Sequence, residues 1–263
     1  MNLLADANGA RVYHADWRVL TAEVGIVDTL IVDAPYSEKT HAGHDDGAED
    51  ANRGIDYRSR VARPSGGTGP RRAISYRPFT PDDVRDFAVV WHRLTRGWFV
   101  SITDHVLAPV WADALESVGR YVFAPLPYVA PGSRVRLTGD GPSAWTCWII
   151  VARPKSRAYS TWGTLPGAYV LPPGCAERMS VVGGKPSWLM ERLAEDYSRP
   201  GDLVCDPCCG AGTTLVGAIR TGRRAAGGDI DRAHAELAAA RIREERQALL
   251  LPAATPTVQG SLL

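Results

Sequence analysis

Short apolar segments alternate with helical segments along most of this 263-residue chain, and this alternation restricts the folds open to it. The apolar segments have the composition of buried strands and lie at residues 27–32, 98–102, 121–123, 145–151, 203–205 and 224–228. The helical segments lie at residues 80–96, 107–118, 187–197, 213–221 and 232–250. Together they predict an α/β fold, with a mostly parallel sheet and helices on both of its faces.

Composition and length are those of a folded globular protein. Hydrophobic residues make up 45% of the chain and charged residues 22%, and the length fits one large α/β domain or two small ones. No apolar run reaches the roughly 18 residues of a membrane-spanning helix, and the first residues lack the pattern of a secretory signal. The net charge of +1 does not by itself indicate a nucleic-acid partner. We therefore expect a protein that makes no use of a membrane.

Residues 37–79 have almost no apolar periodicity, and their charge is divided. Acidic residues fall in the first part and arginines in the second, around a Pro- and Gly-rich stretch at residues 64–70. A structureless segment of this length inside a compact domain is usually functional or disordered, so we predict a mobile loop. The two histidines in it, His41 and His44, are expected to be exposed to solvent.

The first motif with chemical content is the segment from Asp206 to Thr214, which follows a predicted strand and opens a predicted helix. Gly210 and Gly212 allow a tight turn and a close backbone approach to a ligand. Asp229 follows at the end of the next strand, where an acid can accept hydrogen bonds from the hydroxyls of a ribose. The spacing departs from G-x-G-x-x-G, and there is no G-K-[ST] ending, so NAD and ATP are disfavoured.

The cysteines do not indicate a metal site or a disulfide framework. There are five of them, an odd number, and residues 205–209 contain a C-x-x-C without a second pair at zinc-finger spacing. The glycine turn is the better interpretation of that segment, and we expect no metal.

The second motif is the tetrapeptide Asp33-Ala34-Pro35-Tyr36, which ends the first predicted strand. With the glycine turn it resembles the amino-group DNA methyltransferases that use S-adenosyl-L-methionine. That family has a [D/N/S]-P-P-[Y/F/W] tetrapeptide and a D-P-F-x-G-S-G-T-T cofactor signature, and one permuted subclass has them in this order. Residues 184–206 resemble the family's K-P-x-x-L…P-G-D-x-V-L-D-P run, and residues 12–16 resemble its h-x-G-D segment.

The resemblance implies a Rossmann-like methyltransferase fold with a circularly permuted motif order. It assigns the four residues of the tetrapeptide to catalysis. The Asp33 carboxylate and a backbone carbonyl of Ala34 or Pro35 would accept the N–H bonds of an exocyclic amine, and Tyr36 would stack on the flipped base. The implied cofactor-binding residues are Asp16, Lys185, Asp206, Pro207, Cys208, Gly210, Gly212, Thr213, Asp229 and Ile230. This chain departs from the family pattern at Ala34, Cys208 and Ala211, which stand for proline, an aromatic residue and serine.

The resemblance also implies an organisation and a substrate. We expect a single domain over residues 1–263, in which residues 1–36 and 80–130 form a catalytic half and residues 185–250 a cofactor-binding half. The mobile loop at 37–79 and a region at 131–184 would recognise the target.

DNA is the expected partner, and Asp at the first tetrapeptide position favours N6 of adenine. N4 of cytosine, RNA or a protein glutamine as substrate, and a catalytically silent nucleic-acid-binding subunit remain alternatives. The expected setting is the cytoplasm, for an enzyme of bacterial restriction-modification or phage origin. The oligomeric state stays open, a dimer included.

Overall fold

The computed structural model describes residues 1–7, 9–42, 74–132, 144–155, 162–177 and 179–250. Most of the segment expected to be a mobile loop, with His44 and the arginines between residues 53 and 72, therefore lies outside the described residues. So do parts of the expected target-recognition region, at residues 133–143 and 156–161.

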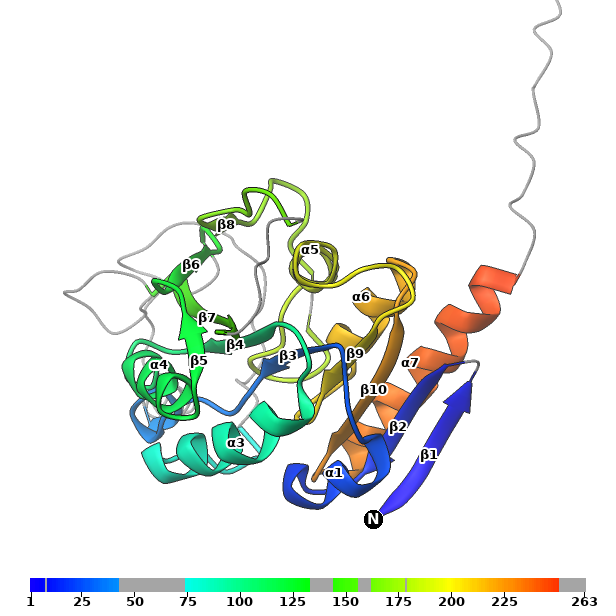
Figure 1. Cartoon of the computed structure of the whole chain (residues 1–263). Coiled ribbons are helices and arrows are strands. Elements are labelled where there is room, and N and C mark those ends of the chain that lie inside the picture. The colour runs from blue at the N-terminus through cyan, green and yellow to red at the C-terminus, as the bar shows by residue number, and fades with distance from the viewer. Residues whose placement is uncertain (8, 43–73, 133–143, 156–161, 178, 251–263) are drawn as a thin grey trace, which may run out of the picture.

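The described residues form one ten-stranded sheet in the order β1-β2-β10-β9-β3-β4-β7-β6-β8, with β5 paired to β7 (Figure 1). The five strands from β2 to β4 run parallel to one another, β1 and β7 flank them antiparallel, and β6 and β8 extend the sheet beyond β7. The strands are β1 (Asn2–Ala7), β2 (Ala10–His14), β3 (Thr29–Asp33), β4 (Phe99–Thr103), β5 (Arg120–Val122), β6 (Leu126–Val129), β7 (Thr146–Pro154), β8 (Tyr169–Val170), β9 (Leu203–Asp206) and β10 (Arg224–Asp229). The predicted α/β fold with a parallel sheet at its centre is confirmed.

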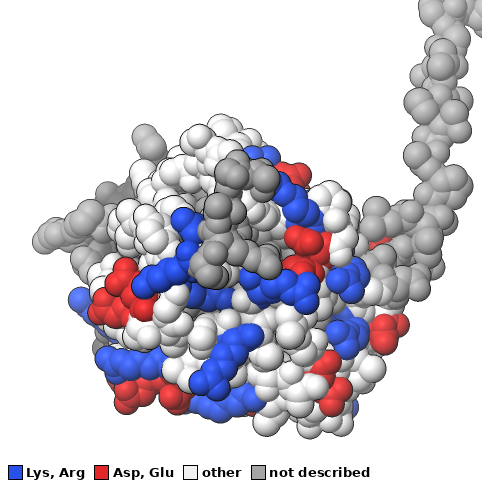
Figure 2. Space-filling view, viewed as in Figure 1, with Lys and Arg blue, Asp and Glu red and all other residues white. Residues whose placement is uncertain are grey.

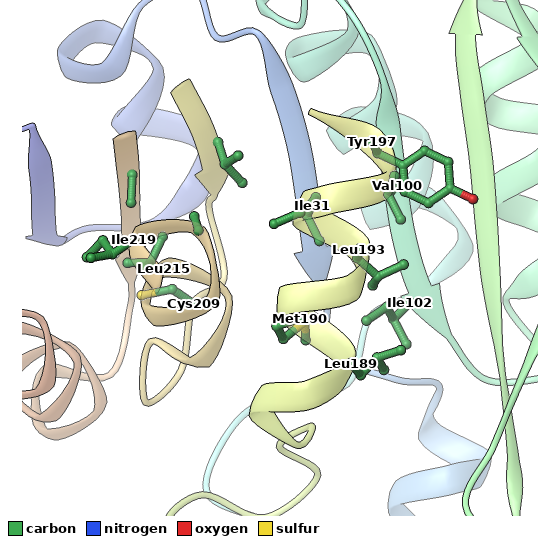
Figure 3. Packing of buried hydrophobic residues seen from close by; sticks show 14 of the residues in the cluster. Ile31, Val100, Ile102, Leu189, Met190, Leu193, Tyr197, Cys209, Leu215 and Ile219 are labelled. Carbon is green, nitrogen blue, oxygen red and sulfur yellow. The ribbon is translucent and has the colours of Figure 1, made fainter. Parts of the chain in front are cut away.

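Helices cover both faces of the sheet, as the alternation of elements predicted (Figure 1). One face packs against α1 (Trp17–Val24), α3 (Pro81–Leu94) and α4 (Ala108–Ser117), and the other against α5 (Ser187–Tyr197), α6 (Thr213–Arg220) and α7 (Arg232–Leu250). Successive residues of β3 point to opposite faces because a strand has a period of two. Leu30 and Val32 belong to the cluster of buried residues on the face covered by α1, α3 and α4. Ile31 belongs to the cluster on the opposite face, with Leu189 and Leu193 of α5 (Figure 3).

Helix α3 begins next to residue 80, where the sequence predicts a helix to start, and it opens with a cap. Thr80 Oγ1 accepts a hydrogen bond from Asp83 N at 3.1 Å, and Asp83 Oδ2 accepts one from Thr80 N at 2.9 Å, which is a capping box. The helix ends at Leu94, two residues before the predicted end at residue 96. A Cβ on Gly97 would lie 2.5 Å from the Asp28 carbonyl oxygen, so glycine is needed there for close packing.

The structure adds elements that the sequence did not predict, and it corrects one expectation. Strands β1, β2, β6 and β8, helix α1 and a helical stretch at residues 38–42 are all additional. His41 belongs to that stretch, and its side chain is buried, with its ring edge-on to Tyr76 at 5.3 Å between centroids. The expectation that His41 is exposed to solvent is therefore wrong, because the segment packs back onto residues beside the tetrapeptide.

Charged side chains of both signs are spread among uncharged residues on the face seen in Figure 2. On the face seen in Figure 2, Lys and Arg side chains form a band across the middle, and Asp and Glu lie in separate patches around it. None of the helices in the described part of the chain has the length and apolar character that crossing a membrane requires.

Candidate functional site

Aspartates stand at the carboxyl ends of all five parallel strands. Asp229, Asp206 and Asp33 are the last residues of β10, β9 and β3, and Asp16 and Asp104 follow β2 and β4. The strands that follow β9 and β3 in the chain lie on opposite sides of this pair, so the strand order reverses between them. Open α/β sheets bind ligands at such a reversal, outside the carboxyl ends of the strands.

A pocket of about 1070 Å³, counted to its open mouth, occupies this edge of the sheet. Every predicted cofactor-binding residue except Gly212 lines it, together with Asp33 and Pro35 of the tetrapeptide. Its other walls were not assigned from the sequence, and they are Trp17, Arg18, Tyr76, Arg77, Phe79, residues 179–184, Met190, Cys209, Ala211, Thr214 and His234.

Gly212 lies behind the pocket and shapes the turn. Its φ is +77°, a left-handed conformation that suits glycine, and it precedes the first residue of α6. A Cβ there would lie 2.8 Å from the Cβ of Ala238 on α7. The glycine therefore allows α7 to pack directly against the back of the turn.

Asp229 fixes the front of the same turn. Its Oδ2 accepts a hydrogen bond from Gly210 N at 2.8 Å, and its Oδ1 accepts one from Asp231 N at 2.8 Å. His234 Nδ1 lies 3.8 Å from Oδ1, and the nearby Asp229 carboxylate raises the pKa of His234. Each carboxylate oxygen has a second lone pair, so Asp229 can also accept from a ligand in the pocket.

Asp206 is the most deeply buried acid of the group. Its Oδ1 accepts from Cys208 N at 3.0 Å. Burial raises the pKa of Asp206 to about 7, and the nearby negative charges of Asp33 and Asp229 add to the shift. Near neutral pH this side chain therefore exists in both protonated and ionised forms.

The cysteines beside Asp206 are not poised for chemistry of their own. Burial raises the pKa of the Cys205, Cys208 and Cys209 thiols well above the usual value, so they stay protonated near neutral pH. No three His, Cys, Asp or Glu side chains among the described residues are arranged to hold a metal ion.

The tetrapeptide lies between the large pocket and a second cavity of about 400 Å³. Asp33 borders both, and Ala34 and Tyr36 border the second. Lys185 Nζ lies 2.9 Å from Oδ1 and 2.9 Å from Oδ2 of Asp33, and 4.8 Å from the centroid of the Tyr36 ring. The lysine predicted to bind cofactor is thus at the pocket wall but paired with the predicted catalytic acid.

A network of charges stands at the mouth of the large pocket. Arg77 donates to both carboxylate oxygens of Asp83 at 2.7 and 2.8 Å, and Arg18 Nη2 donates to Asp83 Oδ1 at 3.0 Å. Arg18 Nη1 also lies 3.5 Å from Asp16 Oδ2. The hydrogen bond from Arg77 holds the pKa of Asp83 well below its usual range. This network was not predicted from the sequence, although Arg18 stands two residues from Asp16 and Arg77 belongs to the segment at 37–79.

The pocket has the chemistry of a site for a positively charged nucleoside. Asp16 and Asp229 offer acceptors for ribose hydroxyls, and the acidic strand ends offer negative charge to a cationic centre. Ile230, whose side chain lines the pocket, is 64% exposed, and Trp17 and Phe79 add apolar wall for a flat ring system. The residues present therefore fit the expected cofactor.

Sequence comparison relates part of the chain to known proteins. Residues 182–240 match a family model described as DNA methylase, for N6 and N4 enzymes. The Type II methyltransferase M2.DpnII of Streptococcus pneumoniae is 38% identical over 63 residues, which are 24% of this chain and 24% of that protein. The chain thus matches about a quarter of the length of this relative.

Solved structures share the fold over most of the chain. The M1.HpyAVI complex with SAM has a TM-score of 0.59 at 19% identity, covering 88% of this chain and 98% of that one. The cytosine-N4-specific PvuII DNA methyltransferase has a TM-score of 0.55 at 13% identity, covering 92% and 93%. The similarity in fold that the motifs predicted is confirmed.

Proposed function

We propose that this chain, which shares its fold with amino-group DNA methyltransferases and the sequence of its cofactor half with the DNA methylase family, methylates an exocyclic amine of a base in DNA with S-adenosyl-L-methionine. One observation carries the proposal: Asp33 borders two cavities, of which the larger also holds Asp16, Asp206 and Asp229. Asp33, the acceptor for the target amine, therefore stands at the wall of the pocket whose acids suit the cofactor.

The site residues divide into a group that would bind the cofactor and a group that would act on the target base. Asp16, Asp229 and the turn at Gly210 would hold the cofactor, with Ile230 against its adenine. S-adenosyl-L-methionine, when bound, supplies an electrophilic methyl group on a sulfonium centre. Residues 1–36 and 80–130 then act as the catalytic half of a single domain, and residues 185–250 as the cofactor half.

Asp33 acts on the nucleophile. The exocyclic amine of a base is a poor nucleophile because its lone pair is delocalised into the ring. The Asp33 carboxylate and a backbone carbonyl of Ala34 or Pro35 accept its N–H bonds, favour tetrahedral nitrogen and localise that lone pair. Asp33 also offers a place for the proton that the methylated amine must lose.

Tyr36 completes the site on the side of the base. A duplex base must leave the stack to reach Asp33, at a cost of a few kcal/mol. Tyr36 lines the second cavity, and stacking of a base on its ring would offset about 1–3 kcal/mol of that cost. The segments at 37–79 and 131–184 are the proposed target-recognition regions, and residues of both line this cavity.

Adenine N6 is the favoured target. The support is the aspartate at the first position of the tetrapeptide, since the family to which it is similar pairs Asp with adenine and Ser with N4 of cytosine. The proposed enzyme is a cytoplasmic modification enzyme of a restriction-modification or phage type.

A methyl-transfer assay tests the proposal. Purified protein and labelled S-adenosyl-L-methionine are incubated with unmethylated duplex DNA of mixed sequence, single-stranded DNA and total RNA, and the digests are analysed by nucleoside mass spectrometry. N6-methyladenine in the DNA is the expected product. N4-methylcytosine would move the target to cytosine, and label in RNA alone would overturn DNA as the substrate. Cofactor binding with no label in any arm would indicate a silent subunit.

A further inference from the structure

Lys185 is buried against the tetrapeptide, although it lies 152 residues after Asp33 in the sequence. Its side chain is 6% exposed and that of Asp33 is 17% exposed. Nζ donates to both carboxylate oxygens of Asp33 at 2.9 Å and to the Gly183 carbonyl at 2.7 Å. Three acceptors therefore match the three donors of an ammonium group, and they fix its position.

The same ammonium touches the other end of the tetrapeptide. It lies 4.8 Å from the centroid of the Tyr36 ring, within the range of a cation–π contact. Asp33 and Tyr36 both border the second cavity, and Lys185 lines the first. One cation thus holds the two tetrapeptide side chains that the proposed function uses.

We propose that Lys185 is a positioning residue for methyl transfer: its ammonium fixes the Asp33 carboxylate, ionised and oriented, between the two pockets, and fixes the Tyr36 ring beside it. This inference rests on the proposed function and gives Lys185 a role other than holding the cofactor.

The pairing with Lys185 keeps Asp33 within reach of the target amine. Asp33 lines both cavities, so its carboxylate stands where an N–H of a base in the second cavity can donate to it. A buried charge without a counter-ion is costly, and a cation held by hydrogen bonds removes that cost.

Lys185 also supplies a positive charge among the acidic groups around Asp33. Asp206 on the neighbouring strand β9 and Tyr128 on β6 lie near Asp33. Burial is the main cause of the raised pKa of both groups, and the charge of Asp33 adds to it. Removing a positive charge from beside a carboxylate favours its protonated form, so Lys185→Met is expected to make Asp33 easier to protonate.

Enzyme kinetics give the first test. In Lys185→Met, we expect kcat to fall roughly 10- to 100-fold, the size expected for losing a hydrogen bond to an ionised group, with the Kd for S-adenosyl-L-methionine little changed. The acid limb of its kcat–pH profile should move to higher pH, and Lys185→Arg should restore part of the rate. Arg85→Met is the control, because Arg85 is an exposed cation of α3 that lines neither pocket. A large rise in the cofactor Kd with unchanged kcat would overturn the inference, as would an unmoved acid limb.

NMR gives a test that needs no activity. The chain has three lysines, Lys39, Lys155 and Lys185, so protein labelled with ¹³C at lysine Cε gives three signals. The Lys185 signal is assigned by its loss in Lys185→Met. In ligand-free protein, Asp33→Asn should shift the Lys185 signal and leave that of Lys155 in place. An unshifted Lys185 signal would overturn the inference even if DNA is methylated, whereas a shift in a protein that methylates no nucleic acid would leave the pairing intact and refute the proposed function.

Discussion

Asp104 ties the segment that follows the tetrapeptide to the end of β4. Its Oδ2 accepts hydrogen bonds from Ser37 N at 2.9 Å and from the Ser37 and Thr40 hydroxyls at 2.5 Å. Its Oδ1 accepts from Val106 N at 3.0 Å and Leu107 N at 2.9 Å. One buried carboxylate therefore joins the residue after Tyr36 to the loop that opens α4.

Replacing Asp104 with alanine should destabilise the fold and loosen the tetrapeptide. Several buried donors would lose their acceptor, and we expect the free energy of unfolding to fall by roughly 2–4 kcal/mol. Urea denaturation measures this. Asp113→Ala, at an exposed position of α4, is the control and should change stability by less than about 0.5 kcal/mol. Equal effects of the two substitutions would contradict the role given to Asp104.

The stabilising effect of Asp104 should disappear in acid. Burial acts to raise the pKa of Asp104, but the hydrogen bonds from Ser37, Thr40 and Leu107 outweigh it, and the pKa lies below its usual value. A lowered folded pKa means that the stabilisation is complete above the unfolded pKa of about 3.9 and is lost as the pH falls through the folded value. The difference in unfolding free energy between wild type and Asp104→Asn should therefore be constant above about pH 5 and shrink below about pH 4. A difference in unfolding free energy that stays constant down to strongly acidic pH would show that the Asp104 carboxylate is not the source of this stability.

Asp83 should matter more than its neighbour Asp82. Asp83→Ala removes the capping box, worth about 1 kcal/mol, and the partner of the half-exposed Arg18 and Arg77, whose ion pairs add less than about 1 kcal/mol each. We expect a loss of about 1–2 kcal/mol in chemical denaturation. Asp82 lies in the same turn, is 87% exposed and pairs only with the exposed Arg85 side chain among the ion pairs described, so Asp82→Ala should be nearly neutral. The reverse order would rule out the cap as the source of stability.

The positions of three acids at strand ends were predictable because their sequence signals are local. A strand pattern followed by an acid or a glycine turn puts Asp33, Asp206 and Asp229 at strand ends, and the parallel order brings those ends together. Helix α3 was predictable for the same reason, since its cap and its apolar face lie within one segment.

Contacts across the sheet were not predictable in this way. Lys185 and Asp33 are 152 residues apart, and Asp104 and Ser37 are 67 apart. A motif gives the element on which a side chain stands, but which partner it meets depends on strand order and register. Strand β1 was missed because its Asn2–Ala7 segment is an edge strand, half exposed and without a clear alternation.

Gly212 and Gly222 provide a matched pair for the packing behind the cofactor turn. Both have positive φ, +77° and +80°, but a Cβ on Gly212 would collide with Ala238 whereas one on Gly222 would meet nothing within 4 Å. Gly222→Ala should cost about 1–2 kcal/mol from the backbone alone, and Gly212→Ala about 1–3 kcal/mol more from overpacking. Thermal unfolding measures the stability of the two variants. Equal losses would show that α7 can move away from a Cβ at residue 212 with no loss of stability.

The two groups of site residues should separate in binding and turnover. Asp33→Asn keeps the shape of the side chain but removes its charge and one acceptor, so we expect transfer to DNA to fall about 100-fold or more while the Kd for S-adenosyl-L-methionine changes little. Asp229→Ala removes the acceptor for Gly210 N and for the ribose, so we expect that Kd to rise at least about tenfold. Calorimetry gives the Kd and the mass-spectrometric assay gives the rate. Together the two measurements separate the two roles, because each variant is expected to change either the transfer rate or the cofactor Kd and to leave the other nearly unchanged. Full activity in Asp33→Asn would refute the mechanism, and unchanged cofactor affinity in Asp229→Ala would show that this acid only shapes the turn.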